Sequence, residues 1–177
     1  MIISLTNHAG HQHNRGSRRL WRPEMGAQHV GSRRKAVAVT WTPAPAGHDY
    51  PAAAAYLGLL ADTDLVQVLT ALLSQTPTVH HAVKDILRAA RLELLGPEDP
   101  EVAKDLKKIR KGVELSPVLL VRGDLASGRT LQIADSYHRV CASYHTDEEA
   151  EVPCGVIEFQ GDGVAPVLHN RPVPDPP

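Results

Sequence analysis

Apolar positions recur at helical spacing in two neighbouring segments of the first half of the chain. The segments are "DYPAAAAYLGLLAD" and "TDLVQVLTALLSQ", and their apolar residues include Tyr56, Leu57, Leu60, Leu65, Val68, Leu69, Leu72 and Leu73. This spacing is typical of amphipathic helices, and residues 62–64 supply a turn and an N-cap between them. We therefore expect two short helices that form a helical extension at 48–76, with an apolar face used for packing.

The next segments also favour helices. "TVHHAVKDILRAARLELLG" predicts a helix or turn from Thr78, followed by an apolar segment at 92–95 that ends at Gly96-Pro97. "DPEVAKDLKKIRKG" predicts a clear helix, with Asp99 as N-cap and Gly112 at its C-terminal end. The apolar residues on one face of that helix, Val102, Leu106 and Ile109, are core candidates.

After Gly112 the pattern changes to short apolar runs rich in β-branched residues. "SPVLLVRG" and "RTLQIAD" predict two strands, and the intervening "DLASG" is a glycine-containing hairpin turn. "SYHRVCASYH" follows as a helix and "EVPCGVIEF" as a third strand. The order is helices, strand, strand, helix, strand, which indicates an α+β fold with a small mixed sheet rather than repeated βαβ units.

Length and composition restrict this picture further. A chain of 177 residues with 42% apolar residues fits one ordinary domain. The net charge of −1 hides an asymmetry, because residues 1–40 carry seven Arg and Lys residues against one acid, Glu24. That basic segment lacks any apolar period, so we expect it to be disordered, and residues 161–177 form a proline-rich tail.

The remaining composition points to a cytoplasmic protein. No run approaches the roughly 20 apolar residues of a membrane span, and the first residues lack a secretory signal pattern, so no membrane partner is expected. Cys141 and Cys154 are too few for a disulfide framework. The histidines lack a scaffold or softer partners, so no metal site is expected from these residues alone.

The stretch "ADSYHR" carries the candidate chemistry, and we call its residues 135–139 the box. If Asp135 or Ser136 caps the helix, the amides of residues 137–139 point out of its N-terminus, where a phosphate can bind. Arg139 can fork onto phosphate oxygens, His138 can move a proton, and Asp135 can act as a base or bind a bridging metal.

A purely structural explanation of the box stays open. In it, Asp135 is only an N-cap, Arg139 pairs with Asp147 or Glu148, and His138 is a partly exposed helix residue. A helical wheel places Tyr137, Val140, Cys141 and Tyr144 on a core flank and leaves His138 and Arg139 off it. We therefore expect that replacing Arg139 by alanine does not unfold the domain. Cys141, on the core flank, is expected to be a buried and inert thiol.

Three motifs make residues 84–159 resemble the ParB/sulfiredoxin superfamily, whose members are often labelled ParB-like nuclease domains. They are "VAKDLKKIRKG" leading into "ELSPVLLVR", the hairpin into "LQIADSYHRVCASY", and the closing "AEVPCGVIE". The resemblance implies a ParB/sulfiredoxin-like domain at 78–160 with a pocket for nucleotide phosphates at the box. The ligand would be a nucleoside triphosphate or diphosphate, with or without Mg²⁺.

The resemblance also assigns roles to single residues. Asp135, His138 and Arg139 match the family box, with Asp135 and His138 as catalytic candidates, whereas Ser136 stands where a glycine is usual. Ser136, Tyr137 and Arg139 are the expected phosphate contacts. Sulfiredoxins carry a reactive cysteine where this chain has Tyr137, so repair of sulfinic acids is not expected. The chain ends soon after the box helix, so a partitioning protein's downstream DNA-binding and dimerisation regions are not expected either.

Arg88 lies where the family often supplies a second phosphate contact, although a surface pair with Asp85 or Glu93 explains it equally well. The leading hypothesis is thus a nucleotide-binding domain, in which hydrolysis or phosphotransfer is left open. The alternatives are a catalytically silent interaction domain that binds a protein partner or a second copy through the helices at 52–74, and a ParB-like nucleic-acid-binding protein or nuclease. The acidic body and the low aromatic content of 4% disfavour nucleic acid as a partner.

Overall fold

The structure is a computed structural model that describes residues 38–158. Nearly all of the predicted basic segment 1–40, and the whole of the predicted tail 161–177, lie outside the described residues. No described helix is both long and apolar enough to cross a membrane.

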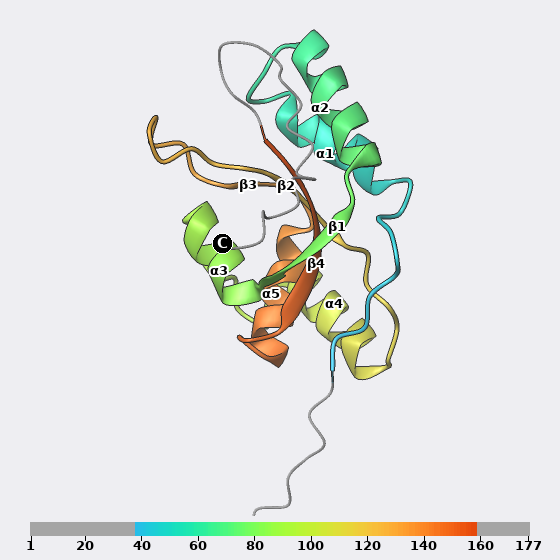
Figure 1. The fold of residues 1–177 in the computed structure, drawn as a ribbon. Helices are drawn as coiled ribbons and strands as arrows, with labels where there is room; N and C mark the ends of the chain where they lie inside the picture. The colour runs from blue at the N-terminus through green and yellow to red at the C-terminus, as the bar shows by residue number, and fades with distance from the viewer. Residues whose placement is uncertain (1–37, 159–177) are drawn as a thin grey trace, which may run out of the picture. The chain divides into compact units, whose positions relative to one another are not determined.

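A four-stranded mixed sheet forms the centre of the fold (Figure 1). Its strands are β1 (Thr78–Ala82), β2 (Val118–Val121), β3 (Gln132–Asp135) and β4 (Glu151–Ile157), in the spatial order β1-β4-β2-β3. Strand β4 is antiparallel to β1 and parallel to β2, while β2 and β3 form the predicted antiparallel hairpin. The expected α+β class with a small mixed sheet is therefore confirmed, as are the three strands predicted from the sequence.

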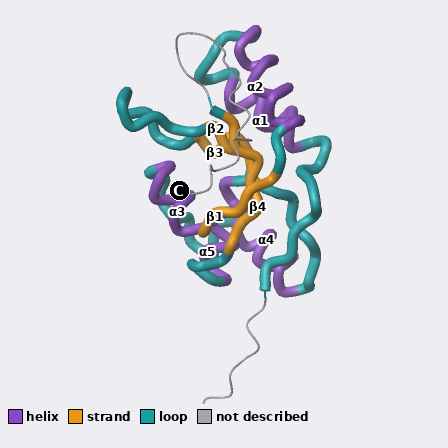
Figure 2. The backbone as a smooth tube through the Cα atoms, in the orientation of Figure 1, coloured by secondary structure: helices purple, strands orange, loops and turns teal. Residues whose placement is uncertain are grey.

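Helices cover both faces of this sheet (Figure 2). The two layers are α1 (Asp49–Leu57) with α2 (Thr63–Gln75), and α3 (Val83–Ala90) with α4 (Pro100–Arg110) and α5 (Tyr137–Thr146). Each layer encloses its own hydrophobic core, and the side chains of β2 alternate between the two cores. Val118 and Leu120 pack with α3, α4 and α5, whereas Leu119 and Val121 pack with α1 and α2. Such a strand is buried on both faces, which explains its continuous apolar run. The helices predicted at 48–76 thus form one complete layer.

Local signals fix the ends of these helices. The Asp62 carboxylate accepts a hydrogen bond from the Leu65 amide at 2.9 Å, and Asp99 accepts one from the Val102 amide at 3.1 Å. Both predicted N-caps are therefore confirmed, and each is worth about 1 kcal/mol. Gly112 follows α4 with a φ of +67°, which is the left-handed conformation that glycine adopts without strain.

The prediction of a helix or turn from Thr78 is wrong for the first five residues of that segment. Thr78–Ala82 is strand β1, paired with β4 from Glu151 to Gly155, and the helix begins only at Val83. β1 lies at the edge of the sheet and is mostly exposed, so it lacks the buried alternation by which a strand is recognised. Its partner is about 70 residues away, and this pairing, rather than local propensity, decides the conformation.

Candidate functional site

The box lies at the junction between β3 and α5. Asp135 is the last residue of β3, Ser136 joins the two elements, and Tyr137 is the first residue of α5. A pocket of about 450 Å³ opens at this junction, and its lining includes Asp135, Ser136, His138 and Arg139. The structure therefore brings four of the predicted site residues to one cavity, which we call the box pocket.

Ser136 adopts a backbone conformation that glycine would favour. Its φ is +86° and its ψ 22°, in the left-handed region, and its side chain makes no capping hydrogen bond to α5. Ser136 therefore stands at the N-cap position, but its side chain does not cap α5, because its hydroxyl donates to the Asp135 carboxylate at 2.9 Å. The first intrahelical bond runs from the Val140 amide to the Ser136 carbonyl, so the amides of residues 137–139 face the helix N-terminus.

Arg139 does not project freely from the helix. Its side chain is only 13% exposed, and its guanidinium donates to the Ser116 carbonyl oxygen at 2.8 Å and to the Asp49 carboxylate at 3.0 Å. The same group also donates to Asp135. The helical wheel places Arg139 off the core flank of α5, but the residue is still largely buried, because α1 brings Asp49 against it. The alternative pairing with Asp147 or Glu148 is not found.

Asp49 is the functional candidate that sequence reasoning missed. It is the first residue of α1, is only 2% exposed, and accepts hydrogen bonds from the Ala46 amide at 3.0 Å and from the Ser116 hydroxyl. Burial raises the pKa of the Asp49 carboxyl, but the hydrogen bond from Ser116 and the charge of Arg139 outweigh burial and lower the pKa below 3.8. Asp49 is therefore a permanently charged group at neutral pH.

Asp135 shares the same guanidinium but has the opposite shift. Burial raises the pKa of its carboxyl above 3.8, and the negative charge of Asp49 adds to that rise, although Arg139 opposes it. Of the two carboxylates on Arg139, Asp135 is thus the one that takes up a proton first as the pH falls. A carboxylate whose pKa is moved toward neutrality is the better candidate for a general base.

Two of the predicted phosphate contacts are placed elsewhere. The Tyr137 hydroxyl donates to the Glu93 carbonyl and its ring packs against the core, so only its backbone amide faces the helix N-terminus. Arg88 is not among the residues that line the box pocket, and it pairs with Asp85 at 2.9 Å, as the structural alternative proposed. His138, by contrast, lines the pocket as expected.

The box pocket is acidic overall. The acidic residues of its lining are Asp49, Glu101, Asp105, Glu114 and Asp135, and the basic ones are Lys108 and Arg139. The lining also includes His48 and His138. No described group of three or more His, Cys, Asp or Glu side chains is arranged to hold a metal ion by itself. A Mg²⁺ ion that arrives with a phosphate needs only one or two carboxylates, because phosphate oxygens and waters complete its octahedron. The carboxylates of the box pocket therefore suit a Mg²⁺ ion that is bound together with a phosphate, rather than a metal ion held by the protein alone.

The two cysteines take no part in the pocket. Cys141 and Cys154 are both fully buried, and burial raises the pKa of both thiols, that of Cys154 to about 12. Because the thiolate is the reactive form, both groups are inert at neutral pH. The prediction that Cys141 is a buried core thiol is confirmed.

Comparison of the chain with protein-family models, with curated proteins and with solved structures finds no significant match. The resemblance of residues 84–159 to the ParB/sulfiredoxin superfamily therefore stays a prediction from the motifs.

Proposed function

We propose that this domain binds a nucleoside phosphate in the box pocket as its Mg²⁺ complex, and that the pocket serves hydrolysis or phosphotransfer. The observation that carries the proposal is the convergence of the α5 N-terminus with Asp135, Ser136 and His138 on one cavity of about 450 Å³. Cavities of this size hold small organic ligands, and a helix N-terminus offers both unpaired amides and a positive dipole end to an anion.

Each side chain has a distinct role in this proposal. The amides of residues 137–139 bind phosphate oxygens, and His138 donates to a phosphate oxygen or moves a proton. Asp135 is the base candidate, because burial raises its pKa. Arg139 positions Asp135 rather than binding phosphate itself, since its guanidinium is already bonded to three partners.

The acidic lining is the reason why, in this proposal, nucleotide binding depends on a cation. The carboxylates of Glu101 and Glu114 in the pocket lining would repel a bare triphosphate. Mg²⁺ neutralises part of the phosphate charge and bridges it to carboxylate oxygens, so the complex has the charge pattern that this pocket requires.

A thermal-shift screen of nucleoside diphosphates and triphosphates, each with and without Mg²⁺, tests the proposal. A nucleotide present at about 100 times its Kd stabilises the folded state by about 2.7 kcal/mol, and we expect this shift only when Mg²⁺ is added. Asp135→Asn is expected to reduce the shift. If no nucleotide raises the melting temperature under either condition, the proposal is wrong.

A protein-interaction domain is the second candidate function, and it is supported by two exposed leucines. Leu59 and Leu60 follow α1 and are 82% and 58% exposed, although most of the apolar face of α1 and α2 is buried on the sheet. A partner would use this small apolar patch. The nucleic-acid alternative relied on the basic segment 1–40, which lies almost wholly outside the described residues.

A further inference from the structure

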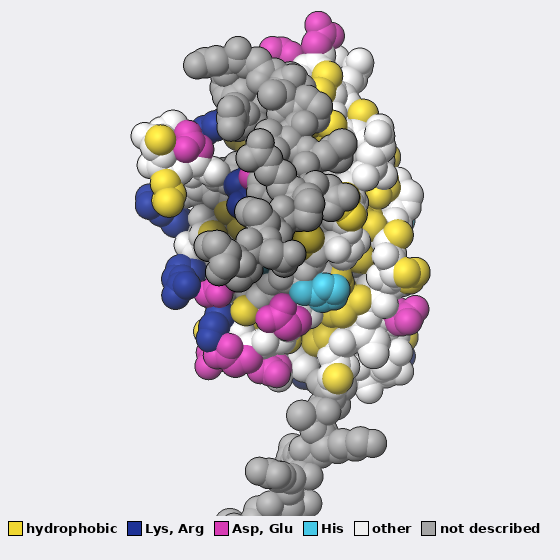
Figure 3. All heavy atoms as spheres, viewed as in Figure 1, with side chains coloured by type: hydrophobic (Ala, Val, Ile, Leu, Met, Phe, Trp, Pro, Cys, Tyr) yellow, Lys and Arg dark blue, Asp and Glu magenta, His cyan; other side chains and the backbone are white. Residues whose placement is uncertain are grey.

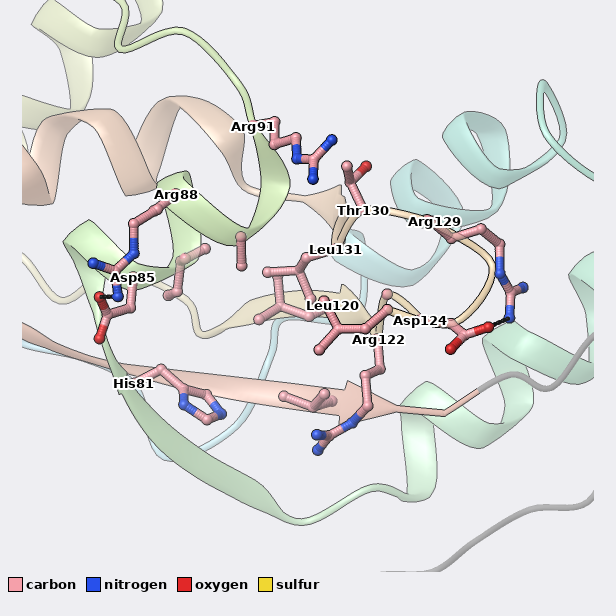
Figure 4. Close-up of a pocket in the computed structure, with 16 residues that line it drawn as sticks. His81, Asp85, Arg88, Arg91, Leu120, Arg122, Asp124, Arg129, Thr130 and Leu131 are labelled. Carbon is pink, nitrogen blue, oxygen red and sulfur yellow. Dashed lines mark ion pairs between the residues drawn. The ribbon is translucent and has the colours of Figure 1, made fainter.

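A second cavity, of about 500 Å³, lies between α3, the end of β2 and the hairpin that joins β2 to β3 (Figure 4). We call it the arginine cleft, because its lining includes Arg88, Arg91, Arg122 and Arg129. It shares no lining residue with the box pocket. Figure 3 shows Lys and Arg side chains gathered on the side of the molecule where α3 and the hairpin lie.

The cleft combines this basic rim with an apolar floor. The apolar part of its lining includes Ile86, Leu120, Leu131 and Val156, which come from α3, the β2–β3 hairpin and β4. Leu125, also part of the lining, is fully exposed at the hairpin tip. The lining holds four guanidinium groups and two carboxylates, Asp85 and Asp124, and Arg122 pairs with Glu158, so among the described residues the arginines exceed their carboxylate partners by about one charge.

One of the arginines, Arg88, makes only a weak ion pair within the protein, and this pair competes little with a ligand for its guanidinium. The Arg88–Asp85 pair measures 2.9 Å, but the Arg88 side chain is 82% exposed. Arg129 lies 3.9 Å from Asp124 and its Nε also donates to the Ser127 hydroxyl at 3.2 Å, so more than one contact holds it. Exposed ion pairs contribute little to stability, so turning the Arg88 guanidinium toward a bound anion costs little. Arg122 is held more firmly, at 2.8 Å from Glu158.

Arg91 is the most informative residue of the cleft. It caps the C-terminus of α3 with a φ of +55°, a left-handed conformation for which glycine or asparagine is preferred. Within the described range 38–158 it makes no ion pair, and in Figure 4 its guanidinium lies above Thr130 and Leu131. The backbone is thus strained at Arg91, whose charge has no counter-ion within the described range. Such strain is common at ligand sites.

We propose that the arginine cleft is a separate binding site for a small organic phosphate monoester with an apolar or aromatic body. At neutral pH a phosphate monoester carries about −1.5 to −2 charges, so it is attracted by Arg91, which has no counter-ion among the described residues, and by the exposed guanidinium of Arg88. The phosphate binds Arg91 together with Arg88, because guanidinium groups fork onto phosphate oxygens. The apolar body covers the half-buried side chains of Leu131 and Val156 and the exposed side chain of Leu125.

Titration of the full chain with 1-naphthyl phosphate, followed by calorimetry, tests this inference. We expect naphthyl phosphate to bind more tightly than inorganic phosphate, because only the former covers the apolar floor, and more tightly than 1-naphthoate, which is a monoanion. Arg91→Ala removes one charge-assisted contact and is expected to weaken binding by roughly ten- to a hundredfold. Arg88→Ala, at a side chain that is 82% exposed, is a second test that leaves the fold intact.

Arg110→Ala is the matched control, because Arg110 is exposed on α4 and does not line the cleft. It should leave the affinity for naphthyl phosphate unchanged, and a Mg²⁺-nucleotide complex should not displace the probe. The inference is overturned if naphthyl phosphate does not bind, if Arg91→Ala and Arg88→Ala both retain full affinity, or if naphthoate binds equally well. Displacement of the probe by the nucleotide would overturn the claim of a separate site.

Discussion

Asp49 and Arg139 are 90 residues apart in the sequence, and their side chains meet at 3.0 Å in the interior. Through this pair the first residue of α1 is joined to the first turn of α5, where the box lies. The layer formed by α1 and α2 therefore takes part in building the box pocket, and the pocket requires both helical layers to be in place.

The first prediction concerns Arg139. Its guanidinium satisfies two carboxylates and a carbonyl in a nearly buried site, so Arg139→Ala leaves two acids without their counter-ion. We expect a loss of about 3 kcal/mol in the free energy of unfolding, measured by urea denaturation. Arg139→Lys should recover little of it, because an ammonium group lacks the planar fork.

Arg110→Ala serves as the reference for this measurement, since an exposed arginine on α4 should change the free energy of unfolding by no more than about 0.5 kcal/mol. An Arg139→Ala protein as stable as this reference would show that the buried network contributes nothing to the fold.

The second prediction concerns the order in which Asp49 and Asp135 titrate. The folded-state pKa of Asp135 is raised above 3.8 and that of Asp49 is lowered below it. As the pH falls from neutral, protonation of Asp135 first favours the folded state, because this group binds its proton more tightly when folded. Protonation of Asp49 below about pH 3.8 then disfavours it, because this group binds its proton more tightly when unfolded.

Carboxyl ¹³C NMR of the folded protein measures both values directly. Asp135→Asn should remove the gain in folding stability on mild acidification. Asp49→Asn should remove the loss of folding stability at lower pH. A folded-state pKa for Asp49 above that of Asp135 would contradict the assignment of Asp135 as the base.

The third prediction concerns the strained backbone at Ser136. A side chain other than glycine at a φ of +86° costs about 1–2 kcal/mol. Ser136→Gly and Ser136→Ala both remove the hydroxyl that bonds Asp135, so their difference isolates the backbone effect. We expect the glycine variant to be more stable than the alanine variant by about 1 kcal/mol in thermal unfolding. Equal stabilities, or a more stable alanine variant, would show that this turn is not strained.

The sequence predicted the elements whose signals are local. The caps at Asp62 and Asp99, the helical spacing of α2 and α4, and the hairpin between β2 and β3 all depend on residues that are close together in the chain. Strand β1 was missed because its pairing with β4 is distant and its exposed histidines carry no strand period.

The site was predicted in part for the same reason. The box pattern brings Asp135, Ser136 and His138 to the lining of one pocket, since they are close together in sequence at one helix start. Asp49 could not be found, because an acid in the first turn of a helix is an ordinary feature and only the packing of α1 brings it to Arg139. The helical wheel missed the contacts of Arg139, because it considers one helix and not the layer of α1 and α2 that supplies Asp49.

The proposed function requires that a phosphate binds at the N-terminus of α5. A ¹H–¹⁵N NMR titration of the full chain with Mg²⁺ and the nucleotide selected by the thermal screen tests it at single residues, with Mg²⁺ alone as the reference. We predict that the largest nucleotide-dependent shifts occur at the amides of residues 137–139, with a smaller effect at Ser136. Shifts confined to the arginine cleft, or no shift at residues 136–139 at a saturating nucleotide concentration, would contradict phosphate binding at the box.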